Sequence, residues 1–158
     1  MQAISLAQPW ASVVARGPKR VENRMEPSTA SVAQTLLGQR IAIHASRHWR
    51  SEAQHKIITM GFPCGMQVEH AFSAILGVAT ITHVHRFSAA AGPDAVKGII
   101  PDDQLKWVHG PWVLVFADVV PCTKPVPWSF RGGSWGGFRT VPADVELKVI
   151  DQLEVAGG

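Results

Sequence analysis

The chain has 158 residues, of which 46% are hydrophobic and 17% charged. This length fits a single domain, which we expect to span residues 1–158, and the composition excludes a disordered chain. The net charge of +3 is small. A domain of this size buries about 68–70% of the surface that its unfolded chain exposes. It therefore needs neither a disulfide nor a metal in order to fold.

The two cysteines and the apolar runs exclude further classes. Cys64 and Cys122 lie far apart and form no Cys-x-x-Cys pair, which excludes a zinc finger or a disulfide scaffold. No apolar run approaches the roughly 18 residues of a membrane span. The first ten residues, MQAISLAQPW, lack the basic segment of a signal peptide. We expect a cytoplasmic protein without a membrane anchor.

The positive charge is concentrated in the first third of the chain. Residues 1–56 hold 8 of the 15 Lys and Arg side chains but only 3 of the 12 Asp and Glu side chains. Such a basic segment favours an anionic partner, nucleic acid first, although a solvated basic face would look the same. The arginines expected to contact phosphates are Arg16, Arg20, Arg40, Arg47 and Arg50.

The first quarter of the chain predicts a strand, a helix and a charged strand. Ala3–Leu6 is a short apolar run typical of a buried strand. Pro9–Arg16 has helical spacing of its apolar residues, and Gly17-Pro18 ends it. The following segment, Lys19–Arg24, is predicted to be a strand. A bulge or turn at Gly17-Pro18 would let Lys19 join the polar face of that strand with Glu22.

A loop, a strand and a second helix are predicted next. Residues 25–38 are rich in Ser, Thr, Ala and Pro, which indicates a surface loop. Arg40–Ala45 alternates as an inner strand. Ser46 is a favourable N-cap for a helix from Arg47 to Met60.

The second half of the chain is predicted to be mostly extended. Ala74–Phe87 is the longest strand signal, because it is rich in β-branched residues. Residues 88–110 predict a long connection with a short helix. Trp112–Val119 predicts a buried strand, and residues 121–128 are extended because of their prolines. A last helix is expected from Pro142. Together these elements predict an α+β fold, a small and mostly antiparallel β-barrel with peripheral helices.

The densest group of charged residues is Gly17-x-Lys19-x-x-Glu22-x-Arg24. Apolar elements precede and follow it, so these side chains are expected to lie against the core. Cations and a carboxylate that are partly buried together are typical of a binding or catalytic site. We therefore expect Lys19, Glu22 and Arg24 to line a cleft.

Three motifs carry a resemblance to a known family. They are Gln-Pro-Trp-Ala at 8–11, the Gly17–Arg24 motif, and Ile-Ala-Ile-His-Ala-Ser at 41–46. Together they resemble the ASCH domains (activating signal cointegrator homology), which belong to the PUA-like superfamily. The resemblance covers most of the chain, with its specific part in the first 50 residues. It implies a PUA-like β-barrel that binds RNA, a nucleoside or a nucleotide in the charged cleft.

The resemblance also implies an alternative enzymatic function. Some small ASCH proteins are amidohydrolases that act on N4-acetylcytidine through a Lys, a Thr three residues later and a distal acid. The Lys corresponds to Lys19, but the Thr position holds Glu22. The distal acid would be one of Asp94, Asp102 and Asp103. Other members are linked to ribonuclease activity, and a cointegrator-type module would bind a protein partner.

Several other residues are candidates for contacts with the ligand. Tryptophan faces stack on bases, and of the candidates Trp10, Trp49, Trp112, Trp128 and Trp135 we favour Trp135, in a Gly-rich loop, and then Trp10. The remaining candidates near the cleft are Gln8, His44 and Ser46. In the core, a lone histidine such as His44 would instead satisfy a backbone carbonyl.

Metal and cofactor sites are not indicated by the sequence. His83 and His85 share one face of a predicted strand, but no third ligand lies at short spacing. The Gly-rich segment after Arg131 lacks the Gly-Lys-Ser/Thr ending of a phosphate loop. We therefore expect no metal and no cofactor.

Overall fold

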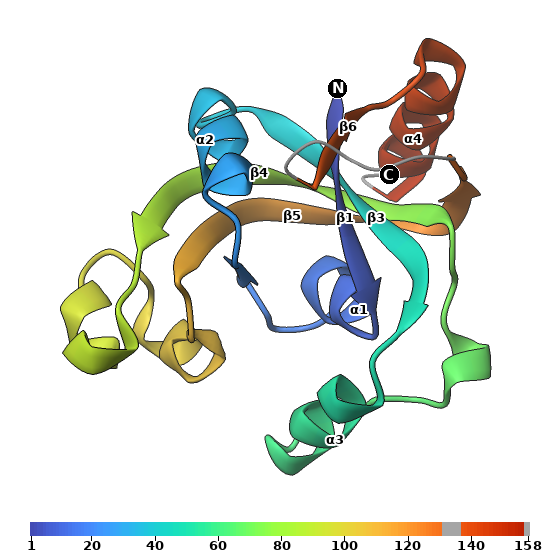
Figure 1. Cartoon of the computed structure of the whole chain (residues 1–158). Helices are drawn as coiled ribbons and strands as arrows, with labels where there is room; N and C mark the ends of the chain where they lie inside the picture. Colours follow the sequence, from blue (N-terminus) through green and yellow to red (C-terminus); the bar gives the residue numbers. More distant parts are fainter. Residues whose placement is uncertain (131–136, 157–158) are drawn as a thin grey trace.

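The computed structural model describes residues 1–130 and 137–156. Six strands form one sheet in the order β2-β5-β4-β3-β1-β6, which curls into a half-barrel (Figure 1). The strands are β1 (Gln2–Gln8), β2 (Val21–Arg24), β3 (Arg40–Trp49), β4 (Ala74–Arg86), β5 (Trp112–Pro127) and β6 (Phe138–Thr140). All neighbouring strands are antiparallel except β1 and β3, which run parallel. The predicted α+β, mostly antiparallel fold is confirmed.

The helices lie on both faces of this sheet. They are α1 (Trp10–Ala15), α2 (Pro27–Thr35), α3 (Ser51–Thr59) and α4 (Ala143–Ala156), with short 3-10 helices η1 (Gln67–Glu69), η2 (Ala89–Ala91), η3 (Pro93–Val96) and η4 (Asp102–Trp107). Helix α1 lies inside the curl of the sheet, and α4 covers the opposite face (Figure 1). Within the described ranges, no helix is both long and apolar enough to cross a membrane.

The strands are apolar on both faces because both faces are covered. In β3, Ile41 and Ile43 belong to the core enclosed with α1, whereas Ala42 belongs to the core under α4. Strands that are covered on both faces are rich in apolar residues at consecutive positions, as in residues 41–45. A third apolar cluster joins Val21 of β2 to η4 and α3, and it lies behind the site described below.

Strands β4 and β5 cross closely at Gly77. A Cβ atom at Gly77 would lie 2.6 Å from the backbone oxygen of Val120, so only glycine fits there. The register between β4 and β5 shifts at this point and at two others. Strand β5 runs without interruption from Trp112 to Pro127, through the segment predicted as extended chain.

Residues 25–38 are not the surface loop that we predicted. Pro27 begins helix α2, and Thr29, Ala30 and Ala33 are buried on its inner face. Ser, Thr and Ala are ambiguous between a loop and a helix of small residues. The helix forms because these small side chains fit closely against the sheet.

The predicted helix from Arg47, with Ser46 as its N-cap, is also wrong at its start. Strand β3 continues to Trp49, which pairs with Gln8, and the Arg50 backbone N–H donates to the Gln8 carbonyl at 2.7 Å. Helix α3 therefore begins at Ser51. The Ser46 hydroxyl instead accepts a hydrogen bond from the backbone N–H of His48. Pairing with β1 outweighs the local capping signal.

Other predicted elements lie close to their expected positions, whereas the short strand β6 was not predicted. Helix α1 and strand β4 match the helix over Pro9–Arg16 and the strand over Ala74–Phe87. The last helix begins at Ala143, next to Pro142, with Asp144 in its first turn. The charged segment differs slightly, because β2 begins at Val21 and leaves Lys19 in the turn before it.

Candidate functional site

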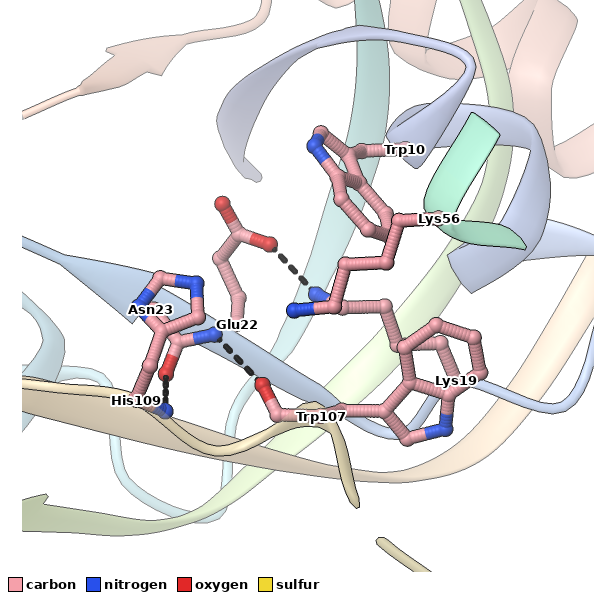
Figure 2. Close-up of a pocket in the computed structure, with 7 residues that line it drawn as sticks. All are labelled: Trp10, Lys19, Glu22, Asn23, Lys56, Trp107 and His109. Atoms are coloured by element: carbon pink, nitrogen blue, oxygen red, sulfur yellow. Dashed lines mark hydrogen bonds and ion pairs between the residues drawn. The ribbon is translucent and has the colours of Figure 1, made fainter. Parts of the chain in front are cut away.

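A pocket lies where α1, the start of β2, α3 and the end of η4 meet (Figure 2). Its volume is about 100 Å³, and it opens to solvent. Its lining residues are Trp10, Lys19, Glu22, Asn23, Lys56, Trp107 and His109. They come from four segments that are far apart in the sequence.

The turn between α1 and β2 places Lys19 at the floor of the pocket. Gly17 allows this turn, because a Cβ atom there would lie 2.8 Å from the Val13 carbonyl oxygen. Lys19 is 2% exposed. Its ammonium group donates to Glu22 Oε2 at 2.8 Å and to the carbonyl oxygen of Val21. The turn before β2, rather than a position within the strand, thus brings Lys19 to Glu22.

Two cations surround the carboxylate of Glu22. Lys19 binds Oε2, and Arg24 Nε lies 3.6 Å from Oε1. Burial by itself raises the pKa of Glu22, but the charges of Lys19 and Arg24 outweigh it and hold the pKa below its ordinary value. Because 3.6 Å is too long for a hydrogen bond, Oε1 keeps its capacity to accept one.

Arg24 lies behind the pocket rather than in its lining. Its guanidinium donates to the Ser5 carbonyl oxygen of β1 at 2.8 Å. A Cβ atom at Gly137 would lie 3.2 Å from the Arg24 Nη1 atom, so the chain before β6 passes close to this group. β2 and β6 are the two edges of the curled sheet. The Arg24 side chain therefore reaches from the edge strand β2 to β1, the neighbour of the other edge strand.

Two side-chain amides fix η4 and its C-terminal turn against the start of β2. Gln104, 2% exposed, donates to the Pro18 carbonyl oxygen at 2.9 Å and accepts from the Arg20 N–H at 2.6 Å. Asn23 donates to the carbonyl oxygen of Trp107 at 2.8 Å and accepts from the N–H of His109 at 2.9 Å. These contacts hold Trp107 and His109 opposite the Lys19–Glu22 pair.

Two tryptophans form the apolar wall of the pocket. The Trp10 and Trp107 rings are nearly perpendicular, with centroids 6.0 Å apart. Trp107 is 1% exposed, whereas Trp10 is half-buried. The Lys19 ammonium lies 5.1 Å from the centroid of Trp10. This wall therefore combines a fixed ring at the back with a partly accessible ring beside the ion pair.

Lys56 enters the pocket from α3 (Figure 2). The next residue, Ile57, is fully buried in the cluster that contains Trp107, so this turn of α3 is anchored. Opposite lies His109. Burial lowers the pKa of His109, and the charges of Lys56 and Lys19 lower it further, against the opposing effects of the Gly110 carbonyl and Glu22. His109 is therefore neutral at pH 7.

Three of the predicted ligand residues hold the scaffold instead of lining the pocket. The Gln8 side chain is fully buried, donating to the Ala71 carbonyl and accepting from Ser12. Arg20 donates to the carbonyl oxygens of Val14, Gly17 and Lys19. Arg16 is exposed and donates to the Cys122 carbonyl at 3.1 Å. Of the predicted binding residues in the described ranges, Trp10 lines the pocket.

His44 lies in a different environment. Its Nε2–H donates to the Trp128 carbonyl oxygen at 2.9 Å, and Nδ1 lies 2.6 Å from the Ser5 hydroxyl. Burial lowers the pKa of His44, opposed by the bond to Trp128. The neutral ring thus accepts from Ser5 and packs beside the Trp128 ring. It satisfies a backbone carbonyl, which is the structural role that the sequence left open.

The other predicted residues are dispersed or lie outside the described ranges. Ser46 is half-buried and Arg47 exposed at the end of β3. Arg40 and Arg50 are also exposed. Trp135, the favoured stacking residue, lies outside the residues that the structure describes. The pocket lining contains none of the three distal acids considered, which are Asp94, Asp102 and Asp103. Over residues 1–130 and 137–156, no cluster of His, Cys, Asp and Glu side chains could hold a metal.

Four lining residues were not singled out in the sequence. They are Asn23, Lys56, Trp107 and His109. Asn23 lies inside the charged motif, directly between Glu22 and Arg24. This position was a weak indication that Asn23 belongs to the site. The other three reach the pocket only through long-range packing of α3 and η4, which no local pattern indicates.

The arrangement favours recognition of a planar polar group. Trp10 offers ring surface for stacking. Glu22 Oε1 offers a hydrogen-bond acceptor and Lys56 a donor. The Lys19 ammonium holds the Glu22 carboxylate in place through Oε2. The buried pair is preorganised by the chain, so a ligand does not have to order it.

Comparisons with known proteins show the fold. No family model matches the sequence, and neither does any curated protein. Among solved structures, the chain is similar to ASCH from Zymomonas mobilis, with 14% identity, a TM-score of 0.50, and coverage of 95% of this chain and 93% of that one. A point variant of the same protein gives 15% identity, a TM-score of 0.50 and coverage of 95% and 96%. At such identity the similarity is one of fold.

Proposed function

We propose that this chain, which has the fold of the ASCH domains, binds an RNA base or a modified nucleoside in the pocket between Trp10 and Glu22. The observation that carries the proposal is the buried Lys19–Glu22 pair at the floor of a pocket with tryptophan walls. A carboxylate held this way accepts from an exocyclic amine, as carboxylates do from cytosine N4. A Trp ring beside it stacks on the face of the base.

The chemistry of the pocket agrees with this ligand, while its size limits how much of the ligand enters. Its volume of about 100 Å³ lies below the about 300–1,000 Å³ of typical small-molecule sites, so the edge of one base enters and the sugar stays outside. The exposed arginines of the N-terminal segment, which include Arg16, Arg40, Arg47 and Arg50, would contact phosphates of a longer RNA.

Calorimetric titration tests the proposal. Adenosine, cytidine, guanosine, uridine and N4-acetylcytidine are titrated into the wild type and into Glu22→Gln. We expect at least one nucleoside with an exocyclic amine to bind, and Glu22→Gln to weaken it because the amide loses the charged acceptor. If no nucleoside and no short RNA binds, the proposal is wrong, and a protein partner becomes the leading alternative.

The salt dependence of RNA affinity separates nucleic acid from protein as partner. Neutralised phosphates release counterions, so the affinity for a short RNA falls steeply with added salt. We expect the slope to decrease when Arg47 and Arg50, both exposed near α3, are changed to Gln. A flat salt dependence would contradict a contact with the RNA backbone.

Hydrolysis of N4-acetylcytidine is the alternative function. The observation that favours it is the position of Lys19, at the pocket floor and hydrogen-bonded to a carboxylate. However, Glu22 occupies the position of the family's Thr, and the Lys19 ammonium is the donor in its hydrogen bonds to Val21 and Glu22. A donating ammonium offers no lone pair for a proton.

Incubation with N4-acetylcytidine distinguishes the two functions. Chromatography for cytidine is performed on the wild type and on Lys19→Ala. Cytidine that depends on Lys19 would make the protein an amidohydrolase, whereas binding without turnover supports the binding function. Cleavage of a short RNA in the same assay would reveal ribonuclease activity.

A further inference from the structure

Lys56 contributes a positive charge to the lining of the pocket. Within residues 1–130 and 137–156, none of the ion pairs involves Lys56. Glu52, one turn earlier on α3, pairs instead with Arg50 at 3.7 Å. The carboxylate of the pocket, Glu22, is already shared by Lys19 and Arg24.

The pocket therefore carries excess positive charge. Three cations, Lys19, Arg24 and Lys56, lie in or directly behind it, against one carboxylate, Glu22. His109 adds no further charge, because burial and then the charges of Lys56 and Lys19 lower its pKa. A neutral ligand leaves this excess uncompensated, whereas an anionic group next to Lys56 compensates it.

The position of Lys56 is fixed by its neighbours. Ala53 and Ile57 are buried on the inner face of α3, and Ile57 packs in the cluster of Trp107 and Phe87. The Lys56 backbone carbonyl accepts from Met60 N–H, within the last turn of the helix. Its side chain thus starts from an anchored backbone and reaches toward the space beside Glu22 and His109 (Figure 2).

We propose that Lys56 forms a phosphate subsite, so that the pocket selects a base attached to a phosphate ester over the free nucleoside. This inference rests on the proposed function and specifies its ligand class. The shared chemistry is a phosphate within reach of Lys56 while the base lies between Trp10 and Glu22. The phosphate belongs either to a mononucleotide or to the backbone of an RNA.

The test compares nucleosides with their phosphates by calorimetry at low salt. The probes are the four ribonucleosides, their 5′- and 3′-monophosphates, the corresponding dinucleotides and ribose 5-phosphate. The proteins are the wild type, Lys56→Gln and the matched control Lys148→Gln. Lys148 lies on α4 outside the pocket lining, and its side chain is 66% exposed. Its substitution removes the same charge as Lys56→Gln.

We expect one monophosphate to bind at least about 10-fold more tightly than its nucleoside, because a hydrogen bond between charged groups is stronger than one between neutral groups. The preference should disappear in Lys56→Gln and persist in Lys148→Gln. It should also fall with added salt, since the screening length is about 10 Å at 0.1 M. Tighter binding of the dinucleotide than of either monophosphate would assign the phosphate to RNA, and the reverse to a mononucleotide.

Other results overturn the inference in distinguishable ways. Equal affinity of nucleoside and monophosphate overturns the phosphate subsite but leaves the proposed function intact. A preference retained in Lys56→Gln overturns the role of Lys56. If ribose 5-phosphate binds as tightly as the nucleotides, the phosphate subsite holds and the base recognition of the proposed function is wrong. Absence of all binding overturns both.

Discussion

The Lys19 ammonium lies 2.8 Å from a carboxylate oxygen of Glu22, and the two side chains are only 3% and 13% exposed. Removing one member of a buried pair leaves the other charge uncompensated, at a cost of about 3–5 kcal/mol. We expect Lys19→Met to lower the free energy of unfolding in urea by about 3 kcal/mol, because Arg24 still faces Glu22. Lys148→Met, which removes an exposed partner of Asp144, should cost about 0–1 kcal/mol. Similar losses in both variants would contradict a buried pair.

The lowered pKa of Glu22 also predicts a dependence of stability on acid. A carboxyl whose pKa is lower in the folded state contributes stability that is fully present above its unfolded pKa, about 4.3. This contribution is lost as the pH falls below that value and through the folded pKa. We expect the free energy of unfolding, measured in urea, to fall between pH about 5 and pH about 3. This fall should be smaller in Glu22→Gln than in the wild type. A parallel loss in both proteins would exclude Glu22 as its source.

Histidine burial predicts a second pH effect, in a different window. The pKa of His44 is lowered by burial, so the unfolded state binds its proton more readily than the folded state. Stability should be complete above pH about 6.5 and fall as the pH drops below it. In His44→Gln this part of the loss should be absent, while the loss due to His109 remains. An unchanged profile between pH about 7 and about 5 would contradict the neutral ring in the fold.

Trp10 is expected to contribute directly to affinity. Stacking of a base on an aromatic ring contributes about 1–3 kcal/mol by alanine substitution. Trp10→Ala should therefore weaken nucleoside binding by about 5- to 150-fold, measured by calorimetry. Trp112→Ala is the matched control, since Trp112 is half-buried beside Arg86 and outside the pocket lining. Equal effects of both substitutions would place the base elsewhere.

The two cysteines should differ in their reactivity toward alkylating reagents. Burial raises the pKa of Cys122 to about 11, against the opposing charge of Arg16, and the thiol is 2% exposed. Cys64 is half-buried, and burial and then Glu69 raise its pKa. Because the thiolate reacts, iodoacetamide at pH about 8 should modify Cys64 slowly and Cys122 only on unfolding. Mass spectrometry of timed samples checks the order, and early modification of Cys122 would contradict its burial.

The sequence predicts the long strands β3 and β4 better than helix α2 and the start of helix α3. The long β-branched run of β4 and the apolar run of β3 are local signals, and both strands occur where expected. Helix α2 and the start of α3 were mispredicted because tertiary contacts decide them. Ala33 packs inside the sheet, and Trp49 pairs with Gln8. Neither contact can be read from neighbours in the chain.

The candidate site likewise contains residues that the local sequence indicates and residues that only the fold brings together. Lys19 and Glu22 are three residues apart, so the motif itself indicated that they would meet. Lys56 and His109 reach the same pocket through packing around Ile57 and the hydrogen bonds of Asn23. Contacts separated by more than 30 residues depend on the completed fold. A single sequence therefore identified the floor of the pocket but not its far walls.

The guanidinium of Arg24 contacts both the floor of the pocket and a second strand of the sheet. It faces Glu22 at the pocket floor through Nε and holds the Ser5 carbonyl of β1 at 2.8 Å. The floor of the pocket and the contact that joins β2 to β1 across the curl of the sheet therefore share one side chain. A substitution of Arg24 would remove both interactions at once.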